Sequence, residues 1–293
     1  MKLADIARRI DLYEKLMRLD KPIGTLLLLW PTLWALWLAV RGVPQWRILA
    51  VFVVGTVLTR SAGVVINDYA DRNFDPHVAR TSNRPLAAGL VTPAEALVLA
   101  SVLGLMAFAL VLTLNRLTIA LSFVGAFLAV SYPFTKRFFV LPQAYLGIAF
   151  GFGIPMAYAA QLAHVPAVAW VLLLANILWT IAYDTEYAMV DRDDDRKIGI
   201  RTSAILFGRF DVAAVMLAHA AFLALLAGIG WRLQLAWPYY VGLAGAAALI
   251  GYQYTLIRGR DAQRCFRAFL NNNWVGGVVF AGIALALLLR RSL

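Results

Sequence analysis

Nine long apolar segments constrain the fold of this chain more than any other feature of its sequence. A helix needs about 20 apolar residues to cross a hydrocarbon core of about 30 Å, and the bilayer interior offers no water to unpaired backbone groups. We therefore expect an all-α, polytopic membrane bundle of nine transmembrane helices. The expected spans are residues 22–40, 46–66, 95–114, 117–134, 141–160, 165–183, 211–229, 236–256 and 273–290.

Composition also indicates lipid as the solvent and excludes several other classes of protein. Hydrophobic residues make up 62% and charged residues 15% of the 293 residues, and the mean hydropathy is +0.73. A soluble domain is about 45–50% apolar and about 25% charged. A single cysteine, Cys265, excludes a disulfide scaffold and a cysteine-based zinc site. We interpret residues 1–293 as one domain, in which residues 1–21 form an amphipathic helix at the membrane interface.

The distribution of charge predicts which side of the membrane carries the chemistry. In a nine-span topology the N-terminal segment and every second loop share one side, and these segments hold most of the 27 lysine and arginine residues. By the positive-inside rule this side is cytoplasmic. All 16 acidic residues lie on the same side or at the span ends that face it. Topology and attraction to anionic lipid headgroups thus explain the net charge of +11, and we expect no nucleic-acid partner.

A first acidic cluster, residues 67–75, directly follows the second span. Asn67, Asp71 and Asp75 are spaced i, i+4 and i+8, so they form one stripe if the helix continues. Acidic groups are unfavourable at the C-terminal end of a helix, where the dipole is negative, unless a cation lies between them. Carboxylate and amide oxygens are suitable ligands for Mg²⁺. The structural alternative is a solvated helix end.

A second acidic cluster, residues 183–195, directly follows the sixth span. Asp184, Asp191 and Asp195 are spaced i, i+7 and i+11, again on one helical face. Mg²⁺ rarely binds in a cage made by protein alone and usually takes up phosphate oxygens from a substrate. Two stripes on separate spans therefore predict a magnesium site built for a diphosphate. Its expected ligands are Asn67, Asp71, Asp75, Asp191 and Asp195.

Arg60 is the ionised side chain that lies deepest in a predicted span. It precedes Asn67 by two helical turns, so it shares the face of the first stripe but lies about 10 Å deeper, at about 1.5 Å per residue. An ionised group at that depth indicates function, and a guanidinium suits a carboxylate partner. Arg60 therefore either binds a substrate carboxylate or pairs with one of the aspartates.

Further cations and hydroxyls border the two clusters. The loop between the fourth and fifth spans contains Tyr132, Lys136 and Arg137, where the two cations either hold phosphate or anchor the loop. The other expected substrate-binding residues are Arg18, Arg72 and Asn67, the last also a metal ligand. The expected supporting residues are Asp68, Arg84, Tyr183 and Asp184.

The two clusters resemble the aspartate motifs of the UbiA superfamily of intramembrane prenyltransferases. Asn67-Asp68-x-x-Asp71-x-x-x-Asp75 is similar to the first motif, and Asp191-x-x-x-Asp195 is similar to the second. The resemblance extends over residues 13–291, with no departure at the motif positions. The runs that resemble the branch acting on 4-hydroxybenzoate are residues 18–24, 67–72, 83–86 and 183–195.

This resemblance implies an architecture and a reaction. It implies nine helices around a central cavity, with Mg²⁺-bound diphosphate between the motifs and a lateral opening to lipid for the isoprenoid tail. The implied reaction transfers a polyprenyl group from polyprenyl diphosphate to the ring carbon ortho to the hydroxyl of 4-hydroxybenzoate, on the route to ubiquinone. The implied location is the bacterial inner membrane, with the active site facing the cytoplasm. We expect no obligate protein partner.

In that reaction, we expect Asp191 or Asp71 to remove the ring proton and Arg60 to hold the acceptor carboxylate. Within the superfamily, dihydroxynaphthoate, haem or a chlorophyllide are alternative acceptors. From another class, a divalent-cation transporter would carry carboxylates near mid-membrane on broken helices, open in turn to both sides. Every acidic residue here falls on one side, which disfavours transport.

Overall fold

All regular secondary structure in the computed structural model is helical over the residues that it describes, 3–77, 81–135, 139–199 and 201–289. The α-helices are α1 (Leu3–Met17), α2 (Ile23–Val40), α3 (Trp46–Ala70), α4 (Pro93–Val111), α5 (Arg116–Thr135), α6 (Pro142–Gly151), α7 (Gly153–Leu162), α8 (Ala167–Ile198), α9 (Ser203–Phe207), α10 (Asp211–Arg232), α11 (Trp237–Ile257) and α12 (Ala262–Leu289). Two short 3₁₀ turns are η1 (Asp75–His77) and η2 (Gly208–Phe210).

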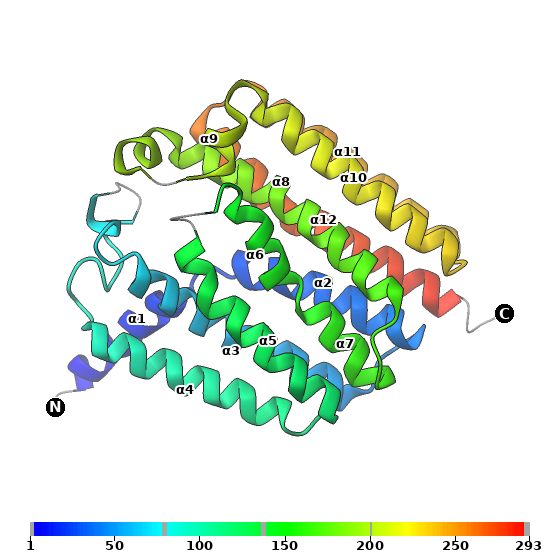
Figure 1. Ribbon diagram of the computed structural model, residues 1–293, viewed down its shortest axis with the longest axis horizontal. Helices are drawn as coiled ribbons and strands as arrows, with labels where there is room; N and C mark the ends of the chain where they lie inside the picture. The colour runs from blue at the N-terminus through cyan, green and yellow to red at the C-terminus, as the bar shows by residue number, and fades with distance from the viewer. Residues whose placement is uncertain (1–2, 78–80, 136–138, 200, 290–293) are drawn as a thin grey trace.

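Nine segments within those described ranges are long and apolar enough to cross a membrane. One of them combines α6 and α7, and another combines α9, η2 and α10, so the seventh span begins at Ser203 rather than at 211. The expected number of spans and the all-helical class are confirmed. In Figure 1 the axes of the long helices are roughly aligned. Helices α1 and α9 lie at one end of the bundle, and the C-terminal end of α12 lies at the other.

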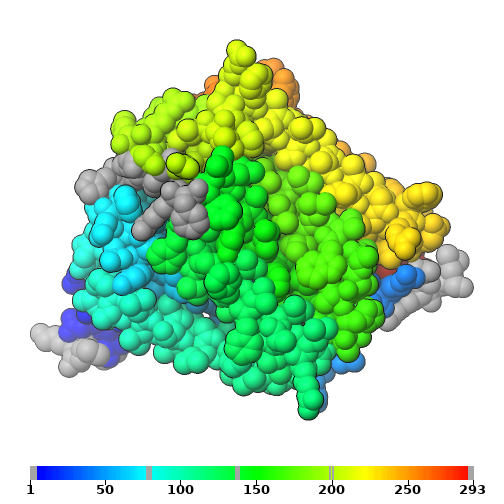
Figure 2. Space-filling model, in the orientation of Figure 1, coloured from blue at the N-terminus to red at the C-terminus, as the bar shows by residue number. Residues whose placement is uncertain are grey.

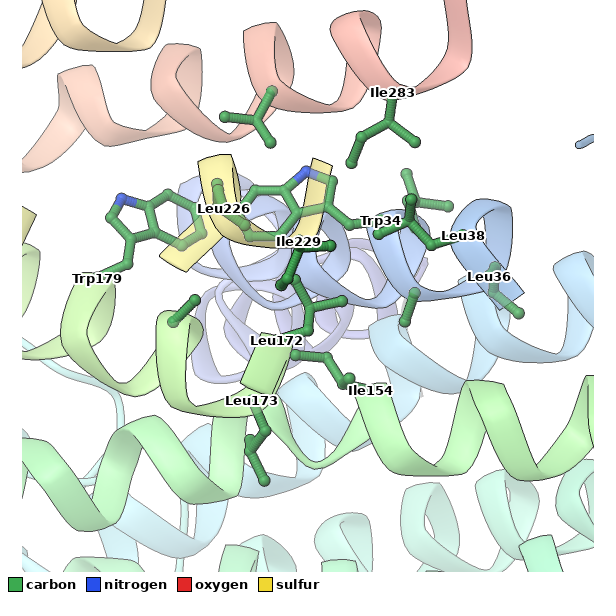
Figure 3. Packing of buried hydrophobic residues seen from close by; sticks show 14 of the residues in the cluster. Trp34, Leu36, Leu38, Ile154, Leu172, Leu173, Trp179, Leu226, Ile229 and Ile283 are labelled. Atoms are coloured by element: carbon green, nitrogen blue, oxygen red, sulfur yellow. The ribbon is translucent and has the colours of Figure 1, made fainter. Parts of the chain in front are cut away.

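A large apolar core joins α2, α7, α8, α10 and α12. Trp34 of α2 is fully buried, and its ring centroid lies 5.2 Å from that of Trp179 of α8. Leu226 of α10 and Ile283 of α12 belong to the same cluster (Figure 3). The Trp34 indole N–H donates to the carbonyl of Gly276 at 3.1 Å, which satisfies the polar group of this side chain. Trp34 therefore holds α2 firmly against three other helices.

Helix α10 packs on α8 and helix α11 packs on α12, and small residues let α11 and α12 approach closely. A Cβ added to Gly242 of α11 would lie 2.9 Å from the Cα of Gly282 of α12. Packing between membrane helices depends on such close approach, because lipid provides little hydrophobic driving force. On the face shown in Figure 2, the green side chains of α6 and α7 lie between the teal side chains of α4 and α5 and the yellow side chains of α10.

Three helices extend beyond the expected spans at the end that carries the acidic clusters. α3 ends at Ala70, α8 ends at Ile198 and α12 begins at Ala262, each several residues beyond the predicted limit. The predicted limits followed the apolar stretch, whereas a helix continues into water until a cap ends it. Gly199 ends α8 in the left-handed region at φ 74°. Asp261 accepts a backbone N–H bond of 2.9 Å at the start of α12.

The fifth span is broken, since α6 ends at Gly151 and α7 begins at Gly153. Glycines on both half-helices let them approach neighbouring helices closely. A Cβ added to Gly147 would lie 2.8 Å from the Cα of Ile177 on α8. One added to Gly153 would lie 2.5 Å from the hydroxyl oxygen of Thr32 on α2. The two half-helices thereby pack against α8 and α2 respectively.

Candidate active site

A cavity of about 1640 Å³ lies among the helices, as the family resemblance implied. Helices α1 to α8 and α12 line it, whereas α10 and α11 contribute none of its described lining residues. On α3 the lining extends from Val51 to Asp71, a length of about 30 Å at about 1.5 Å per residue. Much of the wall is apolar, with side chains such as Leu27, Phe108 and Met156. The cavity is therefore long, apolar along its length and acidic at one end.

Both acidic clusters line this one cavity. The first cluster lies at the end of α3 and in the turn after it, and the second lies on α8. The Asp and Asn residues of the two clusters that line it are Asn67, Asp68, Asp71, Asp75, Asp184, Asp191 and Asp195. Residues that are more than 100 positions apart in the chain are thus brought to a common space. Their individual roles stay predictions.

The first stripe keeps its spacing although the helix ends inside it. The condition of a continuing helix is not met beyond Ala70, because Asp71 is the C-cap of α3. The Asp71 N–H donates to the Asn67 carbonyl at 2.9 Å, and the Asp75 N–H donates to the Asp71 carbonyl at 2.9 Å. These bonds maintain an i, i+4 repeat through the turn. The Asn67 amide also donates to the Asp71 carboxylate at 3.2 Å.

Two arginines bind the carboxylates beside this stripe. Asp68 is buried and accepts bonds from Arg18 at 2.9 Å and from Arg84 at 3.0 Å. Arg84 also donates to Asp75 at 2.9 Å. Arg18 thereby connects the end of α1 to α3, and Arg84 connects the segment before α4 to the same place. Burial raises the pKa of Asp75 above its usual range, although the Arg84 guanidinium opposes that rise.

The second stripe forms a continuous face of α8, because residues 183–195 are all helical. The face opposite Asp184 carries Glu186, which is fully buried. Glu186 accepts a bond of 2.8 Å from the Asn272 amide of α12 and lies 3.8 Å from the His219 imidazole of α10. The Asn272 side chain accepts in turn from the indole N–H of Trp179 at 2.9 Å. This buried network fixes the rotation of α8 about its own axis.

A second buried carboxylate holds α8 from another side. Arg192 of α8 pairs with Asp211 at the start of α10. Asp211 is fully buried and also accepts from Arg260 at 2.8 Å and 3.0 Å. Arg192 directly follows Asp191 in the sequence, so the position of this part of the second stripe depends on Asp211.

Arg60 lines the cavity from α3, on the wall that also carries the first stripe. Its guanidinium carbon lies 5.6 Å from the ring centroid of Phe150 on α6. Gly24 of α2 lies on another side, since a Cβ there would come within 2.4 Å of an Arg60 nitrogen. No ion pair joins Arg60 to a carboxylate of the described residues. The alternative in which Arg60 is the partner of an aspartate thus finds no support.

The remaining predicted residues are placed as follows. Tyr132, Tyr183 and Arg18 line the cavity. Arg72 is not among the lining residues: its guanidinium carbon lies 4.4 Å from the ring centroid of Tyr69 and it donates to the Tyr69 carbonyl at 2.8 Å. Lys136 and Arg137 lie outside the described residues.

Several polar residues that line the cavity were not predicted from the sequence. Arg267 lies on the part of α12 that precedes the predicted span, and Arg201 lies just before α9. Lys15 and Tyr187 also line the cavity. The signal for Arg267 was present: Asp261 is suited to cap a helix start, and it precedes the predicted span by about three turns.

Residues 28–276 match the model of the UbiA prenyltransferase family. The chain belongs to this family. A relative from Nitrosospira multiformis, named 4-hydroxybenzoate octaprenyltransferase, is 66% identical over 98% of this chain and 99% of its own length. A relative of the same name from Cupriavidus necator is 64% identical over 96% of this chain and 99% of its own.

Solved structures of UbiA homologues share the fold. The apo structure of a homologue from Aeropyrum pernix has a TM-score of 0.79 at 28% identity and covers 89% of this chain and 97% of its own. A homologue from Archaeoglobus fulgidus, described as bound to GPP and Mg²⁺, has a TM-score of 0.69 at 16% identity and covers 94% and 99%. The latter similarity concerns the fold alone.

The donors at the acidic end of the UbiA cavity suit a hard cation. Amide and carboxylate oxygens are contributed by two separate helices, and Mg²⁺ prefers oxygen ligands. Among the residues with described positions, no three His, Cys, Asp or Glu side chains converge closely enough to hold a metal alone. Oxygen donors divided between two helices suit an ion whose remaining ligands are water and substrate phosphate oxygens.

Replacing Asp211 tests whether its ion pairs with Arg192 and Arg260 stabilise the fold. Asp211→Ala leaves Arg192 and Arg260 without their shared partner, and breaking a buried ion pair in this way costs about 3–5 kcal/mol. We expect a clear fall in the unfolding midpoint, measured in detergent. Asp194→Ala is the control, because its pair with Lys197 is at the surface and is worth at most about 1 kcal/mol. Equal midpoints for the two variants would contradict the assignment.

Proposed function

We propose that this protein transfers a polyprenyl group from a polyprenyl diphosphate to the ring carbon ortho to the hydroxyl of 4-hydroxybenzoate, with Mg²⁺ as cofactor. The observation that carries this proposal is the cavity itself: two acidic stripes lie at one end, and Arg60 lines it with no carboxylate partner among the described residues. The name of the two relatives specifies the same acceptor. The reaction also releases diphosphate. Its product is used on the route to ubiquinone.

The diphosphate is proposed to bind at the acidic end. Its Mg²⁺ would be held by oxygens of Asn67, Asp71, Asp75, Asp191 and Asp195. When bound, the metal neutralises the charge that develops on the leaving diphosphate. Arg18 lines the same end of the cavity and is available to the phosphate oxygens through the N–H donors that Asp68 and the Lys15 carbonyl do not use.

The long apolar part of the cavity suits the isoprenoid tail. The bond between C1 of the prenyl group and the diphosphate oxygen breaks, and its electron pair leaves with the diphosphate. The resulting allylic cation reacts with water unless the site is dry. Side chains such as Leu27, Phe108 and Met156 exclude water along the wall. A cavity of about 30 Å along α3 has room for an extended chain.

The acceptor is proposed to bind between Arg60 and the acidic end. The Arg60 guanidinium holds the carboxylate of 4-hydroxybenzoate by two parallel bonds, which fixes the orientation of the ring. The carbon ortho to the hydroxyl attacks C1 of the prenyl group, and a carboxylate then removes the proton from that ring carbon. Asp191 is the proposed base, with Asp71 as the alternative. Both line the cavity.

The proposed site also has an orientation in the membrane. We propose that the acidic end faces the cytoplasm of a bacterial inner membrane, since the positively charged loops lie on that side. No protein partner is needed for the reaction as proposed.

The direct test is product formation. Membranes containing the protein are incubated with 4-hydroxybenzoate, a polyprenyl diphosphate and Mg²⁺, and the extracted lipid is analysed by mass spectrometry. We expect 3-polyprenyl-4-hydroxybenzoate, and none after the divalent metal is removed with EDTA. Parallel incubations with dihydroxynaphthoate, haem and a chlorophyllide test the alternative acceptors, and a product from one of these alone would overturn the proposal.

Replacing a predicted metal ligand should abolish transfer. Asp71→Ala and Asp191→Ala each remove an oxygen donor from the acidic end, so we expect product formation to fall below about 1% of wild type, in line with losses of about a hundredfold or more for a single electrostatic group. Unfolding midpoints close to that of wild type would show that the fold is kept. Substantial activity in either variant refutes its metal and base assignments.

Replacing Arg60 should affect one substrate only. Arg60→Ala removes the proposed carboxylate partner, so the KM for 4-hydroxybenzoate rises by about tenfold to a hundredfold, as for loss of a charged hydrogen bond of about 1.5–3 kcal/mol. The KM for the polyprenyl diphosphate stays within about twofold, because Arg60 is two helical turns, about 10 Å along the axis of α3, from Asn67. An equal rise in both KM values would assign Arg60 to the diphosphate or to the fold.

A further inference from the structure

We propose that Gly24 is a positioning residue that determines specificity for a carboxylate acceptor by setting where the Arg60 guanidinium lies. This inference rests on the proposed function of Arg60. Gly24 is a buried residue in the first turn of α2, which packs beside α3. Both Gly24 and Arg60 line the cavity.

The contact between the two residues leaves no room for a side chain at position 24. A Cβ added to Gly24 would lie 2.4 Å from one Arg60 terminal nitrogen, 2.7 Å from Nε and 2.9 Å from the guanidinium carbon. Each of these distances is shorter than a normal van der Waals contact. The whole guanidinium group therefore occupies the space that any other residue would need for its Cβ.

Gly24 and Phe150 together define the position of the guanidinium. Phe150 of α6 lies on another side, with its ring centroid 5.6 Å from the guanidinium carbon. Neither neighbour carries a negative charge, and no carboxylate among the described residues pairs with Arg60. The head group is thus positioned by shape rather than by an ion pair, and its charge stays available to an anionic substrate.

A methyl group at position 24 would move the guanidinium without disturbing the helices. The atoms that the Cβ would meet form the end of a flexible side chain, which can adopt another rotamer. Alanine is also a better helix former than glycine. Gly24→Ala therefore displaces the carboxylate partner of the acceptor while leaving the acidic end and the fold intact.

The first experiment compares kinetic constants of Gly24→Ala and wild type in detergent or proteoliposomes. We expect the KM for 4-hydroxybenzoate to rise about tenfold, since a misplacement of about 1 Å can cost up to about a hundredfold, while the KM for the polyprenyl diphosphate stays within about twofold. The unfolding midpoint stays at or above that of wild type. Gly228→Ala is the matched control, because Gly228 lies on α10 outside the cavity with no atom near its added Cβ, and both KM values stay unchanged.

The second experiment is a double-mutant cycle with Arg60→Ala. If Gly24 acts through Arg60, adding Gly24→Ala to Arg60→Ala causes no further change in the KM for 4-hydroxybenzoate, because the group that the methyl displaces is gone. The neutral acceptor 4-hydroxybenzamide gives an independent readout. The preference of the enzyme for 4-hydroxybenzoate over this amide falls in Gly24→Ala by the same factor as the KM rises.

The outcomes separate this inference from the function on which it rests. An unchanged KM for 4-hydroxybenzoate in Gly24→Ala overturns the inference, as does an equal rise in the Arg60→Ala background. Both results leave the proposed function standing if Arg60→Ala alone raises that KM. If Arg60→Ala leaves the KM unchanged, the assignment of Arg60 falls and the role of Gly24 falls with it.

Discussion

The site depends on holding two rows of like charge at the end of an apolar bundle, where they repel each other more strongly than in water. Ion pairs on the same two helices provide the restraint. At the end of α3, Asp68 binds both Arg18 and Arg84. On α8, Arg192 binds Asp211, which also binds Arg260. Each acidic stripe is thus accompanied by a carboxylate shared between two arginines, and these shared carboxylates are buried. Attraction within these buried ion pairs opposes the repulsion between the acidic side chains that line the cavity.

Different contacts fix the rotation of α8 and of α3 about their own axes. A rotation of one residue, about 100°, would turn the second stripe out of the cavity. It would also pull Glu186 away from Asn272 and His219 and leave an ionisable group buried without partners, which is costly. Among the described residues, different contacts hold the end of α3. There the register is held by the turn bonds after Asp71 and by the arginines beside it.

The fold class, the number of spans and the two acidic stripes could be predicted because they are local patterns of hydropathy and spacing. The helix ends could not, since they depend on caps and on polar residues that a hydropathy window leaves out. Arg267 was missed for this reason, as α12 begins at Ala262. Asn67, Asp71 and Asp75 all line the cavity, but turn bonds rather than a continuous helix keep their spacing, and the sequence pattern did not predict that turn. The contact between Gly24 and Arg60 depends on how α2 packs on α3, which no spacing rule specifies.

The arrangement of charge along the cavity gives a physical reason for the order in which the proposed substrates would lie. The acidic oxygens proposed to bind a cation lie at the end of the cavity, and Arg60 is about two turns deeper on α3. A diphosphate requires the cation and a carboxylate requires the guanidinium, so the two anionic groups are kept apart along one helix. The aromatic ring of the acceptor then has to bridge the interval between them. Because α3 is a rigid helix, that interval is constant, and it determines which ring carbon meets the prenyl C1. Regiospecificity, on this proposal, is a property of the spacing between Arg60 and the first stripe rather than of any single group that touches the reacting carbon.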